Sequence, residues 1–508
     1  MQRGWEHARQ DPDRLAPVAA PAPLDIRTRT PAGRWVITAA VLGSGVAFLD
    51  GTVVNAALPA IADDLDADLA GIQWVLSSYL LTLGSLVVVG GSLGDRRGRK
   101  RMFMFGLVGF GITSLLCGLA PTIELLIGAR MIQGAAAALL VPGSLAIVSA
   151  SFHPDDRGRA IGAWSGLAGV STALGPFVGG WLIDAVSWRL VFLINIPLIA
   201  AALWVTYRHV PESRDETAEG APDVLGGVLL AAGLAGVVFA LIEGPSQGWS
   251  LLTVTAAVLG AAALAAFLAV ELRKPYPMVP MGVFRSSQFS GANLATLAVY
   301  AALSALLFLL VVHLQEDLGY SALEAGSAFL PATAVMLLFS PQSGAVAQRI
   351  GPRIPMTVGP FVLAAGTLLL TRVTPGAGYL RDVLPGVLVV GVGLTITVAP
   401  LTTAVLAAVE DAHAGMASAI NNAVARIAGL LAVAVIPVAA GLSGEGLSWN
   451  DGWTRALTIT AVVAAAGGVV SWLTIRRGEP VHNIVHPSPF MACQDPCVAE
   501  SASPERAA

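Results

Sequence analysis

Charged side chains are scarce in this sequence: Asp, Glu, Lys and Arg together make up 12% of its 508 residues. A soluble domain usually carries about a quarter charged residues, so the chain has half of the ordinary supply. Hydrophobic residues make up 55%, and the mean hydropathy is +0.73 over the whole length. This composition excludes an ordinary soluble protein and indicates one that crosses a bilayer many times.

The sequence also contains few cysteines and has little net charge. The three cysteines, Cys117, Cys493 and Cys497, cannot form a disulfide framework. Cys493 and Cys497 could bind a metal, but two incidental cysteines in a tail are the favoured interpretation, so no metal site is predicted. The formal net charge is only −4, which disfavours a nucleic-acid partner. Because no phosphate-binding loop of the Gly-x4-Gly-Lys-Ser/Thr type occurs, no nucleotide or other cofactor is expected.

Long apolar stretches make up most of the sequence. A helix needs roughly 20 mostly apolar residues to cross a bilayer, and fourteen such stretches lie between Trp35 and Ile475. The short alternating segments of a β-barrel are absent from the sequence. The fold class is therefore an all-α polytopic membrane protein. The predicted spans are 36–59, 72–93, 102–120, 122–148, 159–183, 189–207, 224–242, 250–271, 289–312, 325–347, 355–371, 383–408, 415–440 and 454–475.

The positions of Lys and Arg predict the orientation in the membrane. An even number of spans places both termini on one side, and the loops of that side hold most of the basic residues, above all the Arg96–Arg101 cluster. We therefore expect both termini in the cytoplasm. The tails 1–34 and 476–508 are expected to be disordered, and the first is not a cleaved signal because it has no apolar core. The first outer loop is acidic and contains Asp63, Asp64, Asp66 and Asp68.

Two loops repeat one pattern. Gly91–Lys100 follows the second span, and Gly344–Arg353 follows the tenth, with Gly, Arg and Gly at matching positions. Such a duplication indicates two homologous six-helix bundles, the architecture in which a substrate binds between two rocking halves. The predicted bundles are 35–207 and 289–475, and 208–288 supplies two inserted helices with their linkers.

Three charged residues fall deep inside predicted spans: Asp50, Arg130 and Arg426. A central charge costs about 2.5–3.5 kcal/mol on insertion scales, so such a residue normally faces water or a partner. A carboxyl in a partly dry cavity can exchange a proton near neutral pH, which makes Asp50 the candidate for proton coupling. The alternative is a buried Asp50–Arg130 ion pair that merely holds helices together. The two hypotheses overlap, because a pair that breaks on protonation is itself a switch. Glu243 and Glu271 lie near span ends, where water is within reach.

The loop after the second span combines glycines, one acid and several cations. Glycines permit close packing and a tight turn, and an acid at a helix end can bind basic residues nearby. A plain positive-inside anchor would explain the cations but neither the acid nor the glycines. We therefore predict a gating latch, composed of Gly91, Asp95, Arg96, Gly98 and Arg99.

The fifth span carries glycines at intervals of three or four residues. Such spacing gives a smooth helix face, and a Gly-Pro step predicts a kink or hinge, although packing alone explains most of the pattern. The hinge candidates are Gly166, Gly175, Pro176 and Gly179. Polar and aromatic residues of other spans are candidates to line a substrate cavity, and these are Asn55, Trp74, Gln133, Asn422 and Arg426.

These motifs, taken in the order in which they occur along the chain, resemble those of the major facilitator superfamily. Gly91–Arg101 is similar to the signature loop of the superfamily, and Leu49–Pro59 resembles the first-span motif of its fourteen-span drug:proton antiporters. Arg130–Gly134 resembles the fourth-span motif of these proteins, and Gly162–Gly180 the fifth-span motif of exporters. The resemblance extends from Trp35 to about Ile475. It implies the major facilitator fold, with two six-helix bundles plus two extra central helices.

The resemblance also implies roles for particular residues. Asp50 would carry proton coupling or substrate binding, and Arg130 would assist the proton. Asp95 with Arg99 would close the inner gate, while Gly175 and Pro176 would let the fifth span bend. One position departs from the pattern: Gln348 stands where the loop of the first half has its acid.

The expected function is a proton-coupled antiporter in a bacterial cell membrane, which exports hydrophobic or amphipathic drugs or antibiotics by alternating access. Its partners would be the substrate, protons and the bilayer, and the two-bundle design can work as a monomer. An exporter of an endogenous metabolite or lipid is the alternative, and an importer is disfavoured by the Gly175-Pro176 step. An enzyme would need clustered His, Asp or Glu, but the seven His residues are scattered. A sensor with this fold would carry a soluble domain, for which neither tail is long enough.

Overall fold

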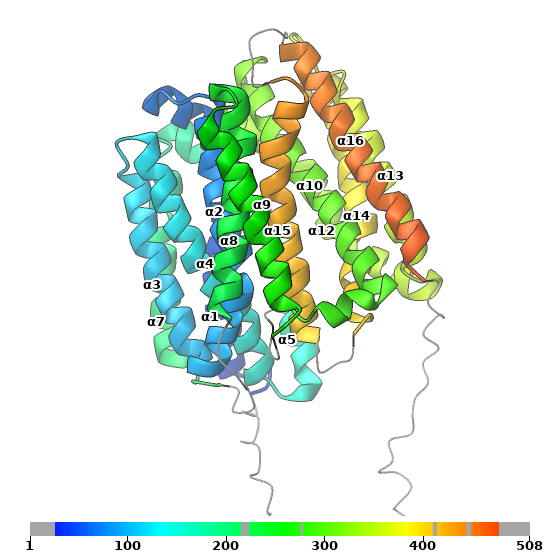
Figure 1. Ribbon diagram of the computed structural model, residues 1–508. Helices are drawn as coiled ribbons and strands as arrows, with labels where there is room; N and C mark the ends of the chain where they lie inside the picture. The colour runs from blue at the N-terminus through cyan, green and yellow to red at the C-terminus, as the bar shows by residue number, and fades with distance from the viewer. Residues whose placement is uncertain are drawn as a thin grey trace, which may run out of the picture.

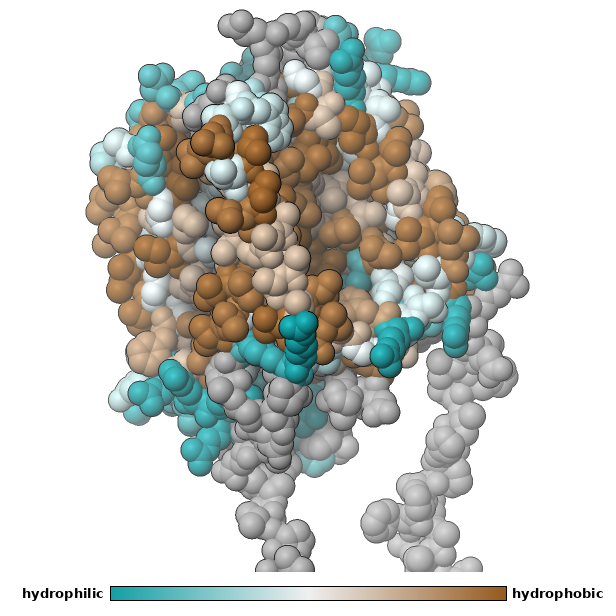
Figure 2. Space-filling model, viewed as in Figure 1, coloured by the Kyte–Doolittle hydropathy of each residue, from teal (hydrophilic) through white to brown (hydrophobic). Residues whose placement is uncertain are grey.

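The computed structural model describes residues 26–214, 223–274, 277, 279–409, 414–442 and 449–476. Within these ranges the chain is built almost entirely of α-helices, which stand side by side in one bundle (Figure 1). On the face seen in Figure 2, the side of the bundle is mostly apolar, and hydrophilic residues gather at its two ends. Most of the two predicted tails, including Cys493 and Cys497, lies outside the described residues.

Seven helices precede the inserted pair, which is α8 and α9, in the described part of the chain. Residues 26–30 precede them and are ordered against α5, because Thr28 donates from its backbone N–H to Asp156 at 3.0 Å. Thr30 caps the first helix. The helices are α1 (Pro31–Leu65), α2 (Leu69–Arg97), α3 (Arg99–Gly118), α4 (Ile123–Ser151), α5 (Pro154–Ala185), α6 (Leu190–Leu193) and α7 (Asn195–His209).

The inserted pair and the second part of the chain follow. A short 3-10 helix precedes α10, and a π-helical turn precedes α14. The elements are α8 (Val224–Gln247), α9 (Leu251–Glu271), η3 (Met281–Arg285), α10 (Ser287–Glu316), α11 (Ala322–Ser327), α12 (Leu330–Ile350), α13 (Arg353–Leu370), η4 (Tyr379–Val383), α14 (Leu384–Leu406), α15 (Ala414–Ala439) and α16 (Trp449–Thr474).

The number of membrane spans agrees with the sequence. Among the described residues, thirteen helical segments are long and apolar enough to cross a membrane. Helix α5 contains 32 residues and packs along α1, so it is the fourteenth long helical segment. The fourteen-span, all-α expectation is therefore confirmed. The bundle boundaries predicted near residues 207 and 289 stay a prediction.

Because successive helices run in opposite directions, their connections gather at two ends. We call the end that carries the Arg96–Arg101 loop the basic end, which is the lower end in Figure 1. The end that carries the α1–α2 connection, with Asp66 and Asp68, is called the acidic end. Helix α1 begins at the basic end and α16 ends there.

Helix packing separates the chain into two groups with the inserted pair at their side. In the first group α1 packs on α5, and α4 packs on α2 and α3; in the second, α10 packs on α15 and α16, and α13 on α14 and α16. Helices α8 and α9 pack on each other, and α8 also contacts α2 and α15. The inserted pair therefore contacts both groups through α8.

The two groups are joined firmly near the acidic end. One apolar core contains Leu58 and Ile61 of α1 together with Leu306 and Leu310 of α10. Asp184, at the end of α5, accepts hydrogen bonds from the backbone N–H groups that begin α11, at 3.1 and 3.0 Å. The acidic end is consequently closed between the groups.

Candidate functional site

The first group encloses a cluster of fully buried polar side chains. Arg130 of α4 donates to Asp50 of α1 and, at 2.7 Å, to Gln133. Gln133 and Asn195 each donate to the second carboxylate oxygen of Asp50, at 3.2 and 3.0 Å. The same two amides also donate to Ser114 of α3, at 2.8 and 3.2 Å. Two of the three charged residues predicted inside spans therefore form one ion pair, surrounded by amide and hydroxyl groups.

The guanidinium of Arg130 is held from its other side by α2. Its Nε donates to the backbone carbonyl of Val75 at 3.2 Å. Its plane lies over the ring of Tyr79, 4.2 Å from the centroid, and Tyr79 itself donates to the carbonyl of Ala47 at 3.1 Å. A buried charge pair is tolerated when its remaining donors and acceptors are satisfied. These contacts give partners to Nε and Nη1 of the guanidinium and to both oxygens of the carboxylate.

Gly134, on the same helix as Arg130, determines how closely α4 approaches α2. A Cβ built on Gly134 would lie 2.2 Å from Thr82 Oγ1 and 2.3 Å from the carbonyl of Tyr79. Thr82 donates its hydroxyl to the carbonyl of Met131 at 2.7 Å. Because α4 can approach α2 this closely only at a glycine, Gly134 sets the distance at which Arg130 reaches Val75 of α2.

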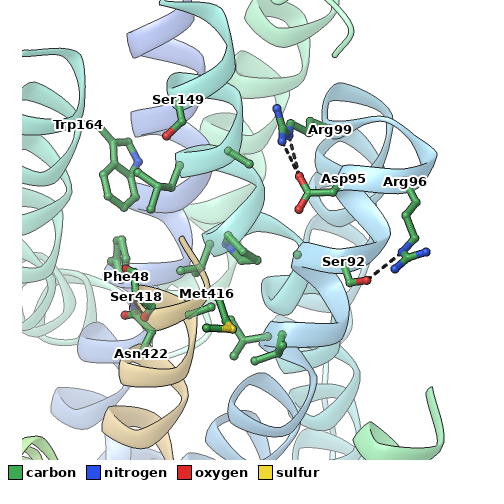
Figure 3. Close-up of a pocket in the computed structure, with 18 residues that line it drawn as sticks. Phe48, Ser92, Asp95, Arg96, Arg99, Ser149, Trp164, Met416, Ser418 and Asn422 are labelled. Atoms are coloured by element: carbon green, nitrogen blue, oxygen red, sulfur yellow. Dashed lines mark hydrogen bonds and ion pairs between the residues drawn. The ribbon is translucent and has the colours of Figure 1, made fainter. Parts of the chain in front are cut away.

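A cavity of about 520 Å³ separates the two groups at the basic end. Helices α1 to α5 supply one side of it, with α3 contributing Arg99, and the start of α15 supplies the other. Phe48, Ser418 and Asn422 face Asp95 and Arg99 across this space (Figure 3). The closed acidic end and this cavity together define a transporter-like bundle that is open on one side.

The predicted gating latch borders this cavity. Arg99, the first residue of α3, contacts Asp95 near the end of α2 through Nε at 2.8 Å and Nη2 at 2.7 Å. Arg96 donates to Ser92 at 3.2 Å. Gly98 lies between the helices with φ = +104°, a conformation that favours glycine. The ion pair thus stabilises the tight turn that the sequence predicts between α2 and α3.

Sequence reasoning missed one member of this loop. Glu212, which follows α7, accepts hydrogen bonds from the backbone N–H groups of Lys100 and Arg101 at 3.0 and 3.1 Å. A carboxylate is stabilised at the N-terminus of a helix by its unpaired N–H groups and dipole, so Glu212 serves as an anionic cap for α3. No local signal could have identified it, because more than 100 residues separate the partners.

A second, mostly apolar cavity of about 600 Å³ lies between α1 and α5 on one side and α10, α12 and α14 on the other. Pro176 and Thr52 line it from the first group. The nearby glycines bring α5 against α1: a Cβ on Gly175 would lie 2.0 Å from Thr52 Oγ1, and one on Gly179 would lie 2.7 Å from Val53. Gly175 and Gly179 of the glycine-rich stripe therefore form a close helix contact. Gly166 lies on the same helix, but its surroundings are outside what the structure describes.

The five predicted cavity residues have different surroundings. Asn422 lines the basic-end cavity, and Asn55 lines a small cleft beside Pro176. Gln133 is instead fully buried beside Asp50, and the guanidinium of Arg426 lies 5.5 Å from the ring centroid of Phe48, which lines the same cavity as Asn422. The indole of Trp74 donates to Glu243 of α8 at 2.8 Å, and Trp74 is not among the residues that line the two cavities described above. An indole N–H in a span needs an acceptor, and the inserted helix provides it.

A bundle of membrane-spanning helices in two groups, with a buried ion pair and a cavity open at one end, is the architecture of a multi-pass membrane transporter. The chain belongs to the Major Facilitator Superfamily, whose family model matches residues 40–433 and, in a second match, residues 294–493.

Curated relatives are named as antibiotic transporters or resistance proteins. The chain is 34% identical to a probable actinorhodin transporter of Streptomyces coelicolor, over 91% of this chain and 82% of that protein. It is 35% identical to a methylenomycin A resistance protein of the same organism, over 91% and 96% of the two chains. It is also 36% identical to the multidrug resistance protein Stp of Mycobacterium tuberculosis, over 78% and 73%.

Solved structures share the fold at low sequence identity. A POT family transporter in complex with 5-aminolevulinic acid is 15% identical, with a TM-score of 0.67 over 89% of this chain and 97% of that one. A bacterial homologue of the lysosomal transporter Spinster, solved in an inward-facing and unoccupied conformation, is 18% identical, with a TM-score of 0.61 over 88% and 97%. These likenesses concern the fold alone.

Proposed function

We propose that the protein is a proton-coupled antiporter that exports hydrophobic or amphipathic antibiotics from a bacterial cell. The observation that carries the proposal is the fully buried Asp50–Arg130 pair in a bundle that is closed at the acidic end and hollow at the basic end. The names of the bacterial relatives support the substrate class and the direction of transport. Both the ion pair and the cavities lie within one chain, which supports a monomer as the working unit.

The basic end faces the cytoplasm in this proposal. Basic residues are retained on the cytoplasmic side of membrane proteins, and the Arg96–Arg101 loop lies at this end. The described chain enters α1 and leaves α16 at the same end, which supports the expectation that both termini are cytoplasmic. The cavity beside Asp95 is then the entrance for a substrate from the cell, and the bundle has its inward-facing form.

Proton coupling acts through Asp50. Its carboxylate is the partner of Arg130 in the inward-facing form, and a proton on Asp50 removes the charge that holds the guanidinium between α1 and α4. The hydrogen bonds from Gln133 and Asn195 can then rearrange, and the two helices can move against each other. An inward proton supplies about 2.3 kcal/mol per 100 mV of membrane potential, so no nucleotide is needed.

The substrate is held between the two groups of helices. Half of the residues that line the cavity beside Pro176 are Val, Leu, Phe or Met, and these side chains suit an apolar ring system. The basic-end cavity adds Ser418 and Asn422 as hydrogen-bonding groups, which suit the polar part of an amphipathic molecule. Gly175 and Pro176 serve as the hinge of α5, and Asp95 with Arg99 forms the latch that holds the inner gate.

Proton release from everted membrane vesicles tests this proposal. A panel of antibiotics and lipophilic dyes is added to energised vesicles that contain the wild type, Asp50→Asn or Asp66→Asn. We expect release with the wild type and with Asp66→Asn, whose carboxyl is at the acidic end, and no release with correctly inserted Asp50→Asn. Equal release from all three would remove Asp50 from the coupling path. A response to an endogenous metabolite alone would replace antibiotics as the substrate class.

A further inference from the structure

Two acidic side chains meet at the basic end of the inserted pair. Asp223 is the N-cap residue of α8, and Glu271 is the last residue of α9. Their exposed fractions are only 8% and 2%, although the sequence placed Glu271 within reach of water. Helices α8 and α9 pack side by side, which brings the start of one next to the end of the other.

One oxygen of each carboxyl has conventional partners. Asp223 Oδ1 accepts from the ammonium of Lys274 and, at 2.7 Å, from the backbone N–H of Gly226. Glu271 Oε2 accepts from the backbone N–H of Val279 at 2.7 Å. Val279 lies directly before η3 and α10. Glu271 therefore ties the end of the inserted pair to the start of the second group.

The other two oxygens face each other without a donor. Asp223 Oδ2 and Glu271 Oε1 are both buried and have no hydrogen-bond partner. Both lie beside Gly226, since a Cβ built there would be 2.9 Å from the first and 2.7 Å from the second. The two carboxyls are within hydrogen-bonding contact of each other. Two acceptors in contact require a proton between them, because buried polar atoms without a partner are costly.

The charges around the pair lead to the same requirement. Among the described residues, Lys274 is the cation that faces the two acids, whereas its neighbour Arg273 is exposed. Two carboxylates and one ammonium leave a net negative charge in a buried place, and one added proton removes it. We propose that Asp223 and Glu271 hold a single proton between their facing oxygens and form a protonation site distinct from the Asp50 cluster.

The helix ends decide which acid holds the proton. Asp223 stands at the N-terminus of α8, where the helix dipole favours a negative charge, and Glu271 stands at the C-terminus of α9, where the dipole opposes one. Burial raises the pKa of Asp223, but its hydrogen bonds from Lys274 and Gly226 outweigh burial and lower this pKa below the usual value. Asp223 is consequently the ionised member, and Glu271 is the acid that donates to it.

The site makes the connection of α8 and α9 to the second group depend on pH. With its proton, Glu271 donates to Asp223 through one oxygen and holds Val279 through the other. When the proton leaves, two adjacent carboxylates repel each other, and the tie to the segment before α10 weakens. The inserted helices thus carry a proton-dependent connection at the basic end, separate from substrate binding.

Infrared spectroscopy of the full-length protein tests the site directly, since a protonated carboxyl has a C=O stretch that a carboxylate lacks. Spectra are recorded over a pH titration for the wild type, Glu271→Gln and Asp223→Asn. Glu124→Gln is the matched control, because Glu124 lies at the start of α4, at the acidic end. We expect Glu271→Gln to lose one protonated-carboxyl band, Asp223→Asn to shift this band and its titration, and Glu124→Gln to match the wild type.

A band that is unchanged in Glu271→Gln at every pH would overturn the proposal. If Glu271→Gln does not fold, a wild-type band position and titration in Asp223→Asn would overturn it equally. Thermal stability gives a second readout: a folded state that holds an extra proton loses stability as the pH rises through its release. We expect this loss in the wild type and a flatter profile in Glu271→Gln, whereas identical profiles would contradict a shared proton. None of these measurements depends on transport or on Asp50.

Discussion

The guanidinium of Arg130 contacts the carboxylate of Asp50 inside the first group of helices, and both residues are fully buried. The pair joins α1 to α4, and Gln133 and Asn195 complete the hydrogen bonding of the carboxylate. Because each charge is the main counter-charge of the other, a change in either one disturbs both helices. This relationship makes the pair suitable as a switch and also gives it a large effect on stability.

The pair can be tested by a double-mutant cycle. Removing one member of a buried ion pair costs about 3–5 kcal/mol, because the other charge is left uncompensated. We expect Arg130→Gln to lower the Tm of the purified protein strongly, and the double variant Asp50→Asn/Arg130→Gln to regain part of the loss. All variants should fail in transport. Additive losses in Tm across the cycle would show that the two charges do not stabilise each other.

Gly134 is predicted to be intolerant of any side chain. A Cβ there would lie 2.3 Å from a backbone carbonyl of α2, so Gly134→Ala must push α4 away from α2. We expect a destabilisation of about 1–3 kcal/mol, as for other overpacked sites, measured as a lower Tm and weaker drug resistance of cells. Gly128→Ala on the same helix is the control, because nothing lies within 4 Å of its added Cβ. Equal behaviour of the two variants would refute the close-contact explanation.

Glu212 is predicted to support the gating loop. Its carboxylate accepts from two backbone N–H groups at the start of α3, and loss of a helix cap costs about 0.5–2 kcal/mol. Glu212→Ala should lower the transport rate while membrane insertion is retained, and Glu212→Gln should keep part of the rate, because its amide oxygen still accepts one hydrogen bond. The measurement is dye efflux from cells at matched expression. An unchanged rate in Glu212→Ala would remove Glu212 from the gate.

Cysteine labelling tests the orientation. In a chain with Cys493 and Cys497 replaced by Ser, the remaining native cysteine, Cys117, is buried. We expect Asp66→Cys to react with a membrane-impermeant thiol reagent in intact cells, and Arg97→Cys, at an exposed position, to react only after permeabilisation. The reverse pattern would place the basic end outside and contradict the positive-inside argument.

Much of the fold was predictable because it depends on local composition. A membrane-spanning segment is apolar over its whole length, so each of the fourteen spans can be recognised from about 20 consecutive residues. Charges inside such segments are rare, which is why Asp50 and Arg130 could be selected without knowledge of their contact. The tight turn at Gly98 was equally predictable, since a glycine between two charged helix ends has few other roles.

Contacts between distant segments were not predictable. Trp74 satisfies the hydrogen-bonding potential of its indole on α8, and Glu212 caps a helix that begins more than 100 residues earlier. Neither residue differs locally from many other aromatic or acidic residues. Asp223 and Glu271 became one site only because α8 and α9 are antiparallel neighbours.

The sequence by itself determined the number of spans, the family and the few charges that a membrane must accommodate, because the cost of placing polar groups in hydrocarbon acts on each segment independently. Only the tertiary structure decided which charges meet, which end is hollow and where two acids face each other without a donor. These properties depend on the distances between helices that lie far apart in the chain. Those distances are set by glycines and side chains that fit together only in the folded bundle.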